Sequence, residues 1–430
     1  MKRFLVTSFI AAGVSISAQT IGNSPYASFG IGDVKYDNTI DISAMGGIST
    51  AYVNDFNNKF NFSNPAANAN FDLASFTLEG TNENNFYKSD YQDVNVTKHS
   101  TYLSNITIAF PISKKLKFGL GYQPYSSKNY NILINEKMAD DTYKANKFTG
   151  KGTLSTVQAA LGYNITNEFA IGLRTNYYFG KLYDTEELTY SNAELVSGYE
   201  TSNKVESFNF TAGTLYQKKL ANERKITAGA TYTFGTSGDM ITRYKHSTYY
   251  YGGSEEHLNE SVIEQKESND KNLIPQQASL GFGFGHEAKW FTSAQFDYKK
   301  GEEIQYLGRP FQYENSYRAA VGGWYLPNYN NFRNYFSRVI YRFGAYYEKG
   351  NLKLSPLGST TATNVNEFAL TAGVTLPFAN TNINRMSNVD IAVEFGKRGT
   401  LENNLINQNF INFKFGLNFA DKWFQKRQYD

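Results

Sequence analysis

The sequence predicts an all-β fold: a transmembrane β-barrel of about 14 antiparallel strands with an N-terminal plug (hatch) segment. Three observations predict it: period-two alternation through most of the chain, an N-terminal export signal, and connections that alternate between short and long. The segment 410–419 shows the alternation clearly, because Ile411, Phe413 and Phe415 share one face while Asn412 and Lys414 share the other. This period places successive side chains on opposite sides of a β-strand.

The first 18 residues have the pattern of a signal peptide. Lys2 and Arg3 precede a mostly apolar stretch over 4–17, and Ala18 offers a small residue at the cleavage site. The stretch is too short to span a membrane as a helix. The chain contains no cysteine, which excludes disulfides, thiol catalysis, thiolate metal sites and a lipoprotein anchor.

Composition and charge narrow the classes of function. Aromatic residues make up 16% of the 430 residues, and 35 glycines stand beside only 9 prolines, which suits a protein of many strands. No segment after the signal peptide supplies the roughly 20 apolar residues of a membrane helix. Removing Lys2 and Arg3 from the 42 basic residues leaves 40 against 39 acidic ones, a net charge of +1, so we expect no nucleic-acid partner.

Strand-like runs follow one another from residue 71 onward. They lie near 71–81, 100–111, 115–125, 153–164, 168–182, 204–219, 224–236, 273–286, 289–300, 315–325, 337–349, 364–378, 387–398 and 407–420. Short turns alternate with long loops at 82–99, 126–152, 183–203, 237–272 and 301–314, as in barrels with short periplasmic turns and longer outer loops.

This rhythm places both termini in the periplasm. It divides the chain into a signal peptide (1–18), a hatch (19–70), a transmembrane barrel (71–420) and a periplasmic tail (421–430). The connection 326–336 breaks the rhythm, since it is long and aromatic where a short periplasmic turn is expected.

Alternation alone also fits a soluble β-sandwich, whose outer face is wet and whose inner face is dry. The export signal, the strand number and the loop rhythm together favour the inverse arrangement, with the apolar face toward lipid and the polar, glycine-rich face toward the lumen. Aromatic residues near strand ends, such as Trp290 and Trp324, suit the membrane interface, although ordinary packing explains any single case.

The segment 43–66 combines a pair of glycines, a stretch with Asn and Asp, and an Asn-Pro-Ala triplet. These residues are Gly46, Gly47, Asn54, Asp55, Asn64, Pro65 and Ala66. Their spacing, before the first strand, resembles the N-terminal hatch of the FadL-type outer-membrane transporters. The resemblance implies a barrel plugged by its N-terminal segment, in a family that carries hydrophobic molecules such as long-chain fatty acids from outside into the barrel wall.

The C-terminal sequence narrows this resemblance. The ending 421–427 and the strand end 394–399 look like the Bacteroidota branch of the same family. Relatives in that branch serve as accessory subunits of outer-membrane machines for protein secretion or barrel assembly. The resemblance therefore implies a second possible role beside transport.

Two sets of residues are functional candidates. The first set lies in the hatch and comprises Gly46, Gly47, Asn64, Pro65 and Ala66. These residues form either a gate that shifts when cargo binds or a fixed stopper that fills the lumen. The second consists of charged side chains that alternation points into the lumen, where they pair with one another or place an arginine against a carboxylate cargo. Its members are Arg174, Asp297, Arg318, Arg338, Arg342, Asp390, Glu394 and Lys414.

Signals of enzyme chemistry are weak. His99, His246, His257 and His286 form no metal-binding spacing, and the sequence has neither a nucleophile elbow nor a phosphate loop. We expect no enzyme activity, no catalytic residue, no metal and no cofactor. The tyrosines at 249–251 are a third candidate feature, since aromatic outer loops capture apolar ligands, contact partners or pack at the membrane edge.

The leading functional hypothesis is a porin-like channel in a Gram-negative outer membrane for passive uptake of hydrophobic, fatty-acid-like molecules. The hydrophobic effect would drive capture, and a hatch rearrangement would open an exit. The alternative is a non-transporting barrel subunit of an outer-membrane secretion or barrel-assembly complex, and a purely structural barrel is a third hypothesis. Expected partners are outer-membrane lipids, with a hydrophobic ligand or detergent in the lumen for transport, or an outer-membrane protein complex for the alternative.

Overall fold

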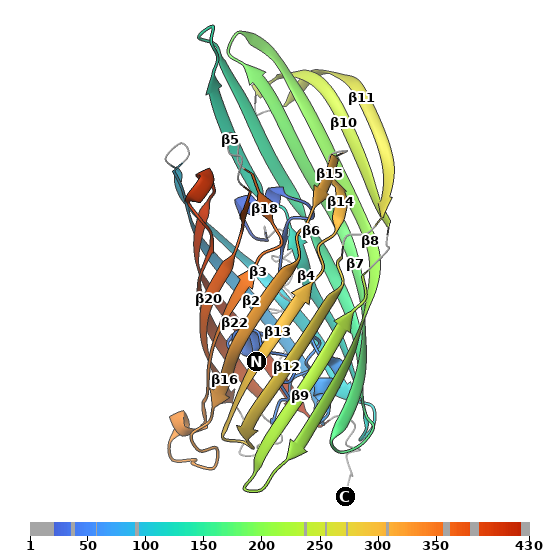
Figure 1. Cartoon of the computed structure of the whole chain (residues 1–430), viewed down its shortest axis with the longest axis vertical. Coiled ribbons are helices and arrows are strands. Elements are labelled where there is room, and N and C mark those ends of the chain that lie inside the picture. The colour runs from blue at the N-terminus through green and yellow to red at the C-terminus, as the bar shows by residue number, and fades with distance from the viewer. Residues whose placement is uncertain are drawn as a thin grey trace, which may run out of the picture.

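In the computed structural model, one antiparallel β-sheet closes on itself into a barrel (Figure 1). The structure describes residues 21–422, with gaps at 36–38, 57, 91–93, 236–238, 254–255, 272–273, 307–308, 356–361 and 379–386. The expected signal peptide and residues 423–430 of the expected tail therefore lie outside the described residues.

Fourteen strands make up the barrel wall, each antiparallel to its neighbours, and β2 pairs with β22 to close it. They are β2 (Ala74–Ser89), β3 (Val94–Pro111), β4 (Leu116–Ser127), β6 (Tyr143–Asn164), β7 (Phe169–Tyr190), β8 (Ala193–Lys219), β9 (Arg224–Thr233), β12 (Gln277–His286), β13 (Trp290–Lys299), β16 (Ser316–Tyr325), β17 (Ile340–Lys349), β20 (Glu367–Phe378), β21 (Ser387–Gly399) and β22 (Asn407–Asp421). Each corresponds to one of the runs that the alternation predicts, and the predicted fold class is confirmed.

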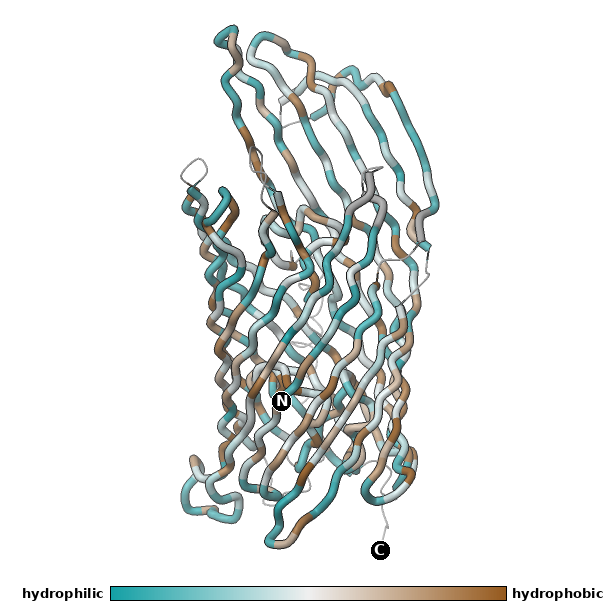
Figure 2. Tube along the Cα trace, in the orientation of Figure 1, coloured by the Kyte–Doolittle hydropathy of each residue, from teal (hydrophilic) through white to brown (hydrophobic). Residues whose placement is uncertain are grey.

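The two faces of the wall divide as a barrel in lipid requires. On β22, Phe413 and Phe415 are 54% and 52% exposed, whereas Asn418 is fully buried and Lys414 points inward to an ion pair with Glu394. Figure 2 shows apolar residues distributed around the barrel part and a more hydrophilic outer extension. Lipid covers the apolar face, and the interior satisfies the polar groups. We refer to the exposed apolar side chains around the barrel as the apolar belt.

The outer connections are largely strand, which corrects the prediction of loops at 82–99, 126–152, 183–203 and 237–272. The outer halves of β6, β7 and β8 continue without interruption, and β5 (Tyr130–Lys137), β10 (Asp239–Tyr251) and β11 (His257–Lys271) join them. In the order β5–β6–β7–β8–β10–β11 they form an outer wall that rises above the rest of the rim on one side (Figure 1). Alternation is weak in these residues because both faces of the outer wall meet water.

The remaining connections are shorter. Two small hairpins, β14–β15 (Glu303–Tyr306 and Arg309–Gln312) and β18–β19 (Lys353–Leu354 and Thr363–Asn364), and the turn η8 (Glu402–Asn404) lie at the outer end. Tight turns join strands at the opposite end, as expected. The connection between β16 and β17 is long, as the sequence indicates, and contains the 3-10 turn η6 (Tyr335–Arg338).

The N-terminal segment lies within the barrel (Figure 1). It contains η2 (Pro25–Ser28), β1 (Asp33–Val34), α2 (Ile40–Ser43) and η3 (Pro65–Asn68). The short helix α2 packs against β20, β21 and β22, while η3 packs against β6, β7 and β8 on the other side of the lumen. None of the helices among the described residues is long and apolar enough to cross a membrane.

Candidate functional site

The interior of the barrel is filled at its centre by residues 44–66, which touch the wall at lumen-facing glycines. A Cβ atom at Gly281 would lie 2.9 Å from the backbone nitrogen of Ala51, and one at Gly172 would lie 2.5 Å from that of Ala66. Both distances are shorter than real Cβ contacts. Eight strands supply such a glycine, which together we call the glycine collar: Gly162, Gly172, Gly213, Gly229, Gly281, Gly322, Gly344 and Gly373. The collar brings the backbone of the N-terminal segment directly against the wall.

Gly46 and Gly47 turn the chain at the collar. Their φ angles are +70° and +78°, in the left-handed region that favours glycine. The Gly46 N–H donates to Thr371 Oγ1 at 2.9 Å, and its carbonyl accepts from Arg318 Nη2 at 2.8 Å. A Cβ at Gly46 would also lie 2.9 Å from the backbone of Ala345. Both positions therefore favour glycine because of their backbone conformation, and at Gly46 a side chain would also collide with the wall.

The triplet Asn64-Pro65-Ala66 begins η3 on the opposite side. Asn64 Oδ1 accepts from the Ala66 N–H at 3.1 Å and caps the turn. Its Nδ2 donates to the carbonyls of Thr50, at 2.6 Å, and Thr214 of the wall, at 3.1 Å. Asn64 is fully buried, so this one side chain links two parts of the N-terminal segment to β8.

Buried ion pairs connect the N-terminal segment to the wall. Lys59 contacts Asp390 of β21 and lies 3.4 Å from Asp41, and all three side chains are at most 4% exposed. Lys225 of β9 pairs with Asp55 in the same way. In a low-dielectric interior such pairs stabilise docking only while both partners are present.

Most of the other predicted lumen charges also find partners inside. Arg318 lies 3.4 Å from Asp297, and Lys414 lies 3.1 Å from Glu394. Arg342 Nε donates to Thr375 Oγ1 at 3.2 Å, and its charge interacts with the buried carboxylates of Asp41 and Asp390. Arg174 donates to the neutral groups of Gln158 and Thr211 at 3.5 and 3.4 Å.

One sequence prediction for the wall is wrong, and one alternative that the sequence left open is decided. Arg338 lies in η6, in the connection before β17, and its guanidinium stacks on Tyr329 and Phe332. The alternation was extended past the true start of the strand, so this residue was wrongly placed in the lumen. Trp324 is buried at 3% exposure and packs against Phe56 of the N-terminal segment rather than at the membrane interface.

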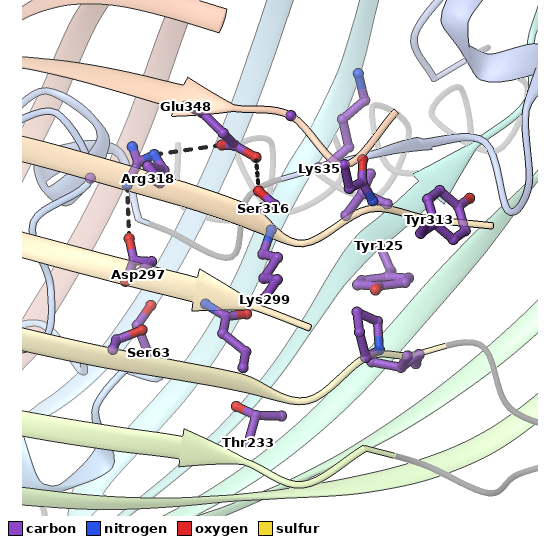
Figure 3. A pocket seen from close by; sticks show the side chains of 18 of the residues that line it. Lys35, Ser63, Tyr125, Thr233, Asp297, Lys299, Tyr313, Ser316, Arg318 and Glu348 are labelled. Carbon is purple, nitrogen blue, oxygen red and sulfur yellow. Dashed lines mark hydrogen bonds and ion pairs between the residues drawn. The ribbon is translucent and has the colours of Figure 1, made fainter. Parts of the chain in front are cut away.

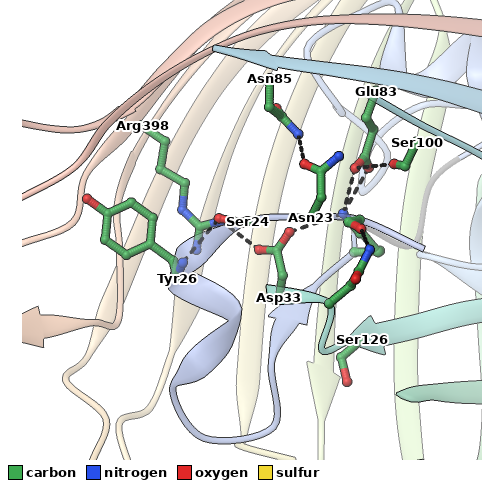
Figure 4. Close-up of polar contacts among 12 residues, drawn as sticks. Asn23, Ser24, Tyr26, Asp33, Glu83, Asn85, Ser100, Ser126 and Arg398 are labelled. Carbon is green, nitrogen blue, oxygen red and sulfur yellow. Dashed lines mark hydrogen bonds and ion pairs between the residues drawn. The ribbon is translucent and has the colours of Figure 1, made fainter. Parts of the chain in front are cut away.

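A second charged cluster fixes the outer half of the N-terminal segment, and the sequence did not single it out (Figure 4). Asp33 accepts from Arg398 at 2.6 Å and from Lys35 at 3.1 Å, and Lys35 also donates to Glu83 at 2.8 Å. Burial alone would raise the pKa of Asp33, but the two cations outweigh it and hold that pKa below its usual range. The sequence signal that could have indicated this cluster is the presence of Asp33 and Lys35 in a segment otherwise rich in Gly, Asn and Ser.

A cavity of about 220 Å³ separates the outer and inner parts of the N-terminal segment. Figure 3 shows Asp297, Lys299, Arg318 and Glu348 pointing into it. Tyr125, Tyr313 and several aliphatic residues contribute apolar surface on its outer side. Charged and hydroxyl groups from several strands therefore interrupt any apolar lining. Among the described residues, no group of three or more His, Asp or Glu side chains could hold a metal ion.

The comparison with protein families shows which family this chain belongs to. A family model described as BamG matches residues 1–430. The chain belongs to the BamG family. A search of curated protein sequences found no significant match to this BamG-family chain.

The fold of this BamG-family protein is similar to that of solved outer-membrane channels. One is the CymD monoaromatic hydrocarbon channel, with a TM-score of 0.57, 12% identity, and coverage of 91% of this chain and 98% of that one. Another is the Pseudomonas putida toluene transporter TodX, with a TM-score of 0.55, 14% identity, and coverage of 91% of this chain and 99% of that one. A third is the Ralstonia pickettii toluene transporter TbuX, with a TM-score of 0.56, 12% identity, and coverage of 92% of this chain and 99% of that one.

This likeness confirms the barrel architecture that the FadL-type resemblance implies. At such low identity it speaks for the fold alone. The closed barrel and its apolar belt support an outer-membrane location, while the Bacteroidota branch stays a prediction.

Proposed function

We propose that this chain is a non-transporting barrel subunit of an outer-membrane protein assembly or secretion complex. The observation that carries the proposal is the closure of the lumen by residues 44–66, which sit against the glycine collar and are held by buried ion pairs. We take the N-terminal segment as a fixed stopper.

A comparison of the free energy that holds the N-terminal segment with the free energy that a small cargo returns on binding favours a fixed stopper over a gate. Breaking a buried ion pair by removing one partner costs about 3–5 kcal/mol. Burying an apolar group the size of a phenylalanine side chain returns only about 1.5–3 kcal/mol. A cargo no larger than a phenylalanine side chain therefore returns less free energy than the loss of one such pair costs, and two pairs, those of Lys59 and Lys225, hold the segment. A long fatty acid, at about 0.8 kcal/mol per buried CH₂, would return more. The charged lining of the 220 Å³ cavity adds a desolvation cost for such a cargo.

The outer wall offers what the lumen does not, namely accessible surface. Its faces expose apolar side chains such as Leu133, Leu195 and Ile263, which are 54%, 44% and 59% exposed. These lie on strands that rise beyond the apolar belt (Figure 1). These residues lie on separate strands, so it is the accessible area of the outer wall, and not a continuous apolar patch, that supports a role as a binding platform.

Passive uptake of hydrophobic, fatty-acid-like molecules is the second candidate. Pairing between β3 and β4 ends at Ile106–Tyr122, near the outer edge of the apolar belt. A smaller cavity of about 130 Å³ adjoins this point, lined among others by Ser104 and Pro124. The solved neighbours named as hydrocarbon channels and toluene transporters share the fold, which favours keeping this candidate.

One experiment separates the two. The full chain would be purified in mild detergent from its native membrane, and its bound proteins and lipids quantified by mass spectrometry. In parallel, the purified barrel would be placed in vesicles and the entry of toluene and of a fluorescent fatty acid measured against empty vesicles. We expect a stoichiometric protein partner and no accelerated entry. Accelerated entry without a stoichiometric partner would overturn the proposal and favour uptake.

A further inference from the structure

The outer half of β3 is a strand edge without a partner strand among the described residues. Its pairing with β4 covers only Ile106–Pro111, whereas its pairing with β2 continues to Val94. Beyond Tyr122, β4 turns its edge to β1 of the N-terminal segment, where Asp33 pairs with Ser127. The backbone of 94–105 is thus hydrogen-bonded on one side only. On the other side of the opening, β6 is the partner strand of β5 among the described residues, and η2 of the N-terminal segment also contacts β5.

This edge carries few of the features that usually protect an open strand, namely Lys98 and a register shift at Ser104 next to its inner end. Natural edges carry charges, proline or bulges that discourage pairing with another chain. The edge strand β11 follows that rule, since its sequence includes Glu260, Glu264 and Glu267 and its pairing with β10 is irregular. Residues 94–105 instead read Val-Asn-Val-Thr-Lys-His-Ser-Thr-Tyr-Leu-Ser-Asn, with high β propensity, one lysine, and no acid, proline or glycine.

The position of this edge, next to the apolar belt, makes it unfavourable to leave its backbone hydrogen-bonding groups unpaired. Its inner end adjoins the apolar belt, marked on β3 by Ile108 and on β4 by Leu120, which are 41% and 44% exposed. Unpaired backbone groups are poorly tolerated next to lipid, where no water replaces the missing hydrogen bonds. At the outer end, Val94 and Val96 are 37% and 39% exposed. Both ends of the edge would gain from a covering strand.

We propose that the β3 edge binds a β-hairpin of another polypeptide, which inserts between β3 and β5 and pairs with both. This inference rests on the proposed role as a subunit and names the contact. Backbone hydrogen bonds would supply the affinity, and alternate side chains would set the register, as in other cases of strand addition.

The directions of the strands select a hairpin. β3 runs inward, from Val94 to the turn at 112–115, while β4 and β5 run back outward. A single inserted strand antiparallel to β3 would be parallel to β5. Two strands joined by a turn are antiparallel to both, and they preserve the alternation of the whole sheet.

The same directions exclude antiparallel pairing between the β3 edges of two copies of this chain. Two copies inserted the same way up in one membrane both carry β3 running inward. Their β3 edges would therefore meet parallel, which is incompatible with an antiparallel two-strand contact. The chemistry of the edge points to a hairpin of low charge and high β propensity, since the flanking residues Thr97, Ser100 and Thr101 are neutral.

Backbone hydrogen exchange tests this directly. The complex purified in mild detergent would be compared with the isolated chain, stripped of partners by a harsher detergent that keeps the barrel closed. We expect about half of the amides in 94–105, those pointing away from β2, to exchange at least 100-fold more slowly in the complex. Amides of β11 serve as the internal control and should not change.

A pair of matched variants makes the test specific. Val94→Lys with Val96→Lys places charges on the β3 edge, and Leu258→Lys with Val262→Lys does the same on β11, where the residues are 45% and 52% exposed. Barrel closure is checked for both by heat-modifiable gel mobility. We expect only the β3 variant to lose the slow exchange.

The outcomes also separate this inference from the proposed function. Rapid exchange of 94–105 in a sample that does contain a stoichiometric partner would overturn the hairpin and leave the subunit role standing. Absence of any stoichiometric partner would overturn both. Equal loss of protection in the two variants would also contradict pairing at this edge.

Discussion

Replacing Lys59 by methionine tests whether buried charge holds the N-terminal segment in the barrel. The substitution keeps the length of the side chain and removes its charge. It leaves Asp390 and Asp41 buried at 2% and 1% exposure without the cation that lies between them. Arg342 is then the remaining cation near both carboxylates. Two buried carboxylates that share one cation in a low-dielectric interior are unfavourable.

The expected magnitude follows from the burial. Breaking such a pair from one side costs about 3–5 kcal/mol. At about 1.4 kcal/mol per factor of ten, this raises the population in which residues 44–66 are undocked by roughly two to four powers of ten. A matched control is Lys219→Met, because its ion pair with Glu287 is 64% and 46% exposed and exposed pairs contribute about 1 kcal/mol or less.

The assay is hydrogen exchange of the N-terminal segment in the purified barrel, together with single-channel conductance in planar bilayers. We expect faster exchange in 44–66 and more frequent openings for Lys59→Met, with little change for Lys219→Met. Adding Asp41→Asn to Lys59→Met should restore part of the protection, because the buried Arg342 then faces Asp390 as the single remaining carboxylate. If residues 44–66 of a closed Lys59→Met barrel exchange as slowly as in the unmodified protein, the argument is refuted.

Three further predictions concern the same segment. Gly229→Leu should keep the barrel closed but exclude residues 44–66 from the lumen, seen as new protease cleavage in the segment, because a side chain there would collide with the Thr50 carbonyl. Asn64→Ala should cost about 2 kcal/mol of docking, measured by exchange, since it removes a turn cap and the side-chain donor to the carbonyls of Thr50 and Thr214. The lowered pKa of Asp33 stabilises docking above its ordinary value of about 4, and this contribution is lost as pH falls through its lower value in the folded state. Protease access to residues 31–35 should therefore rise below about pH 4, and Asp33→Asn should abolish that rise.

The barrel could be predicted from sequence because each strand in lipid repeats the same constraint. An apolar side chain must stand at every second position, as Phe413 and Phe415 do, or the wall would expose polar groups to hydrocarbon. That constraint ends where lipid ends. The outer wall is paired backbone with water on both sides, so Tyr130–Lys137 and His257–Lys271 had no periodic signal and were interpreted as loops.

The interior was predictable only in part, since alternation shows which way a residue points but not what it meets. It placed Arg318 and Asp390 inside correctly, and it left open whether they pair or bind cargo. The partners come from the N-terminal segment, and Lys59 meets Asp390 across 331 positions of sequence. Arg338 was misplaced because a period-two pattern continued by chance into η6.

The glycine collar bears on whether the N-terminal segment moves at all. A gate must leave its seat and return, and each state needs its own contacts. The collar provides contacts for one state only: with the segment withdrawn, the glycine positions on strands from β6 to β20 would present bare backbone at the level of the collar. A channel wall built for traffic would carry side chains that select a cargo there. Glycines at Gly162, Gly172 and Gly213, which face residues 64–66 instead, fit a wall shaped around a resident segment. On this argument the accessible chemistry of the chain lies at its outer wall and at the open edge of β3, and not in its lumen.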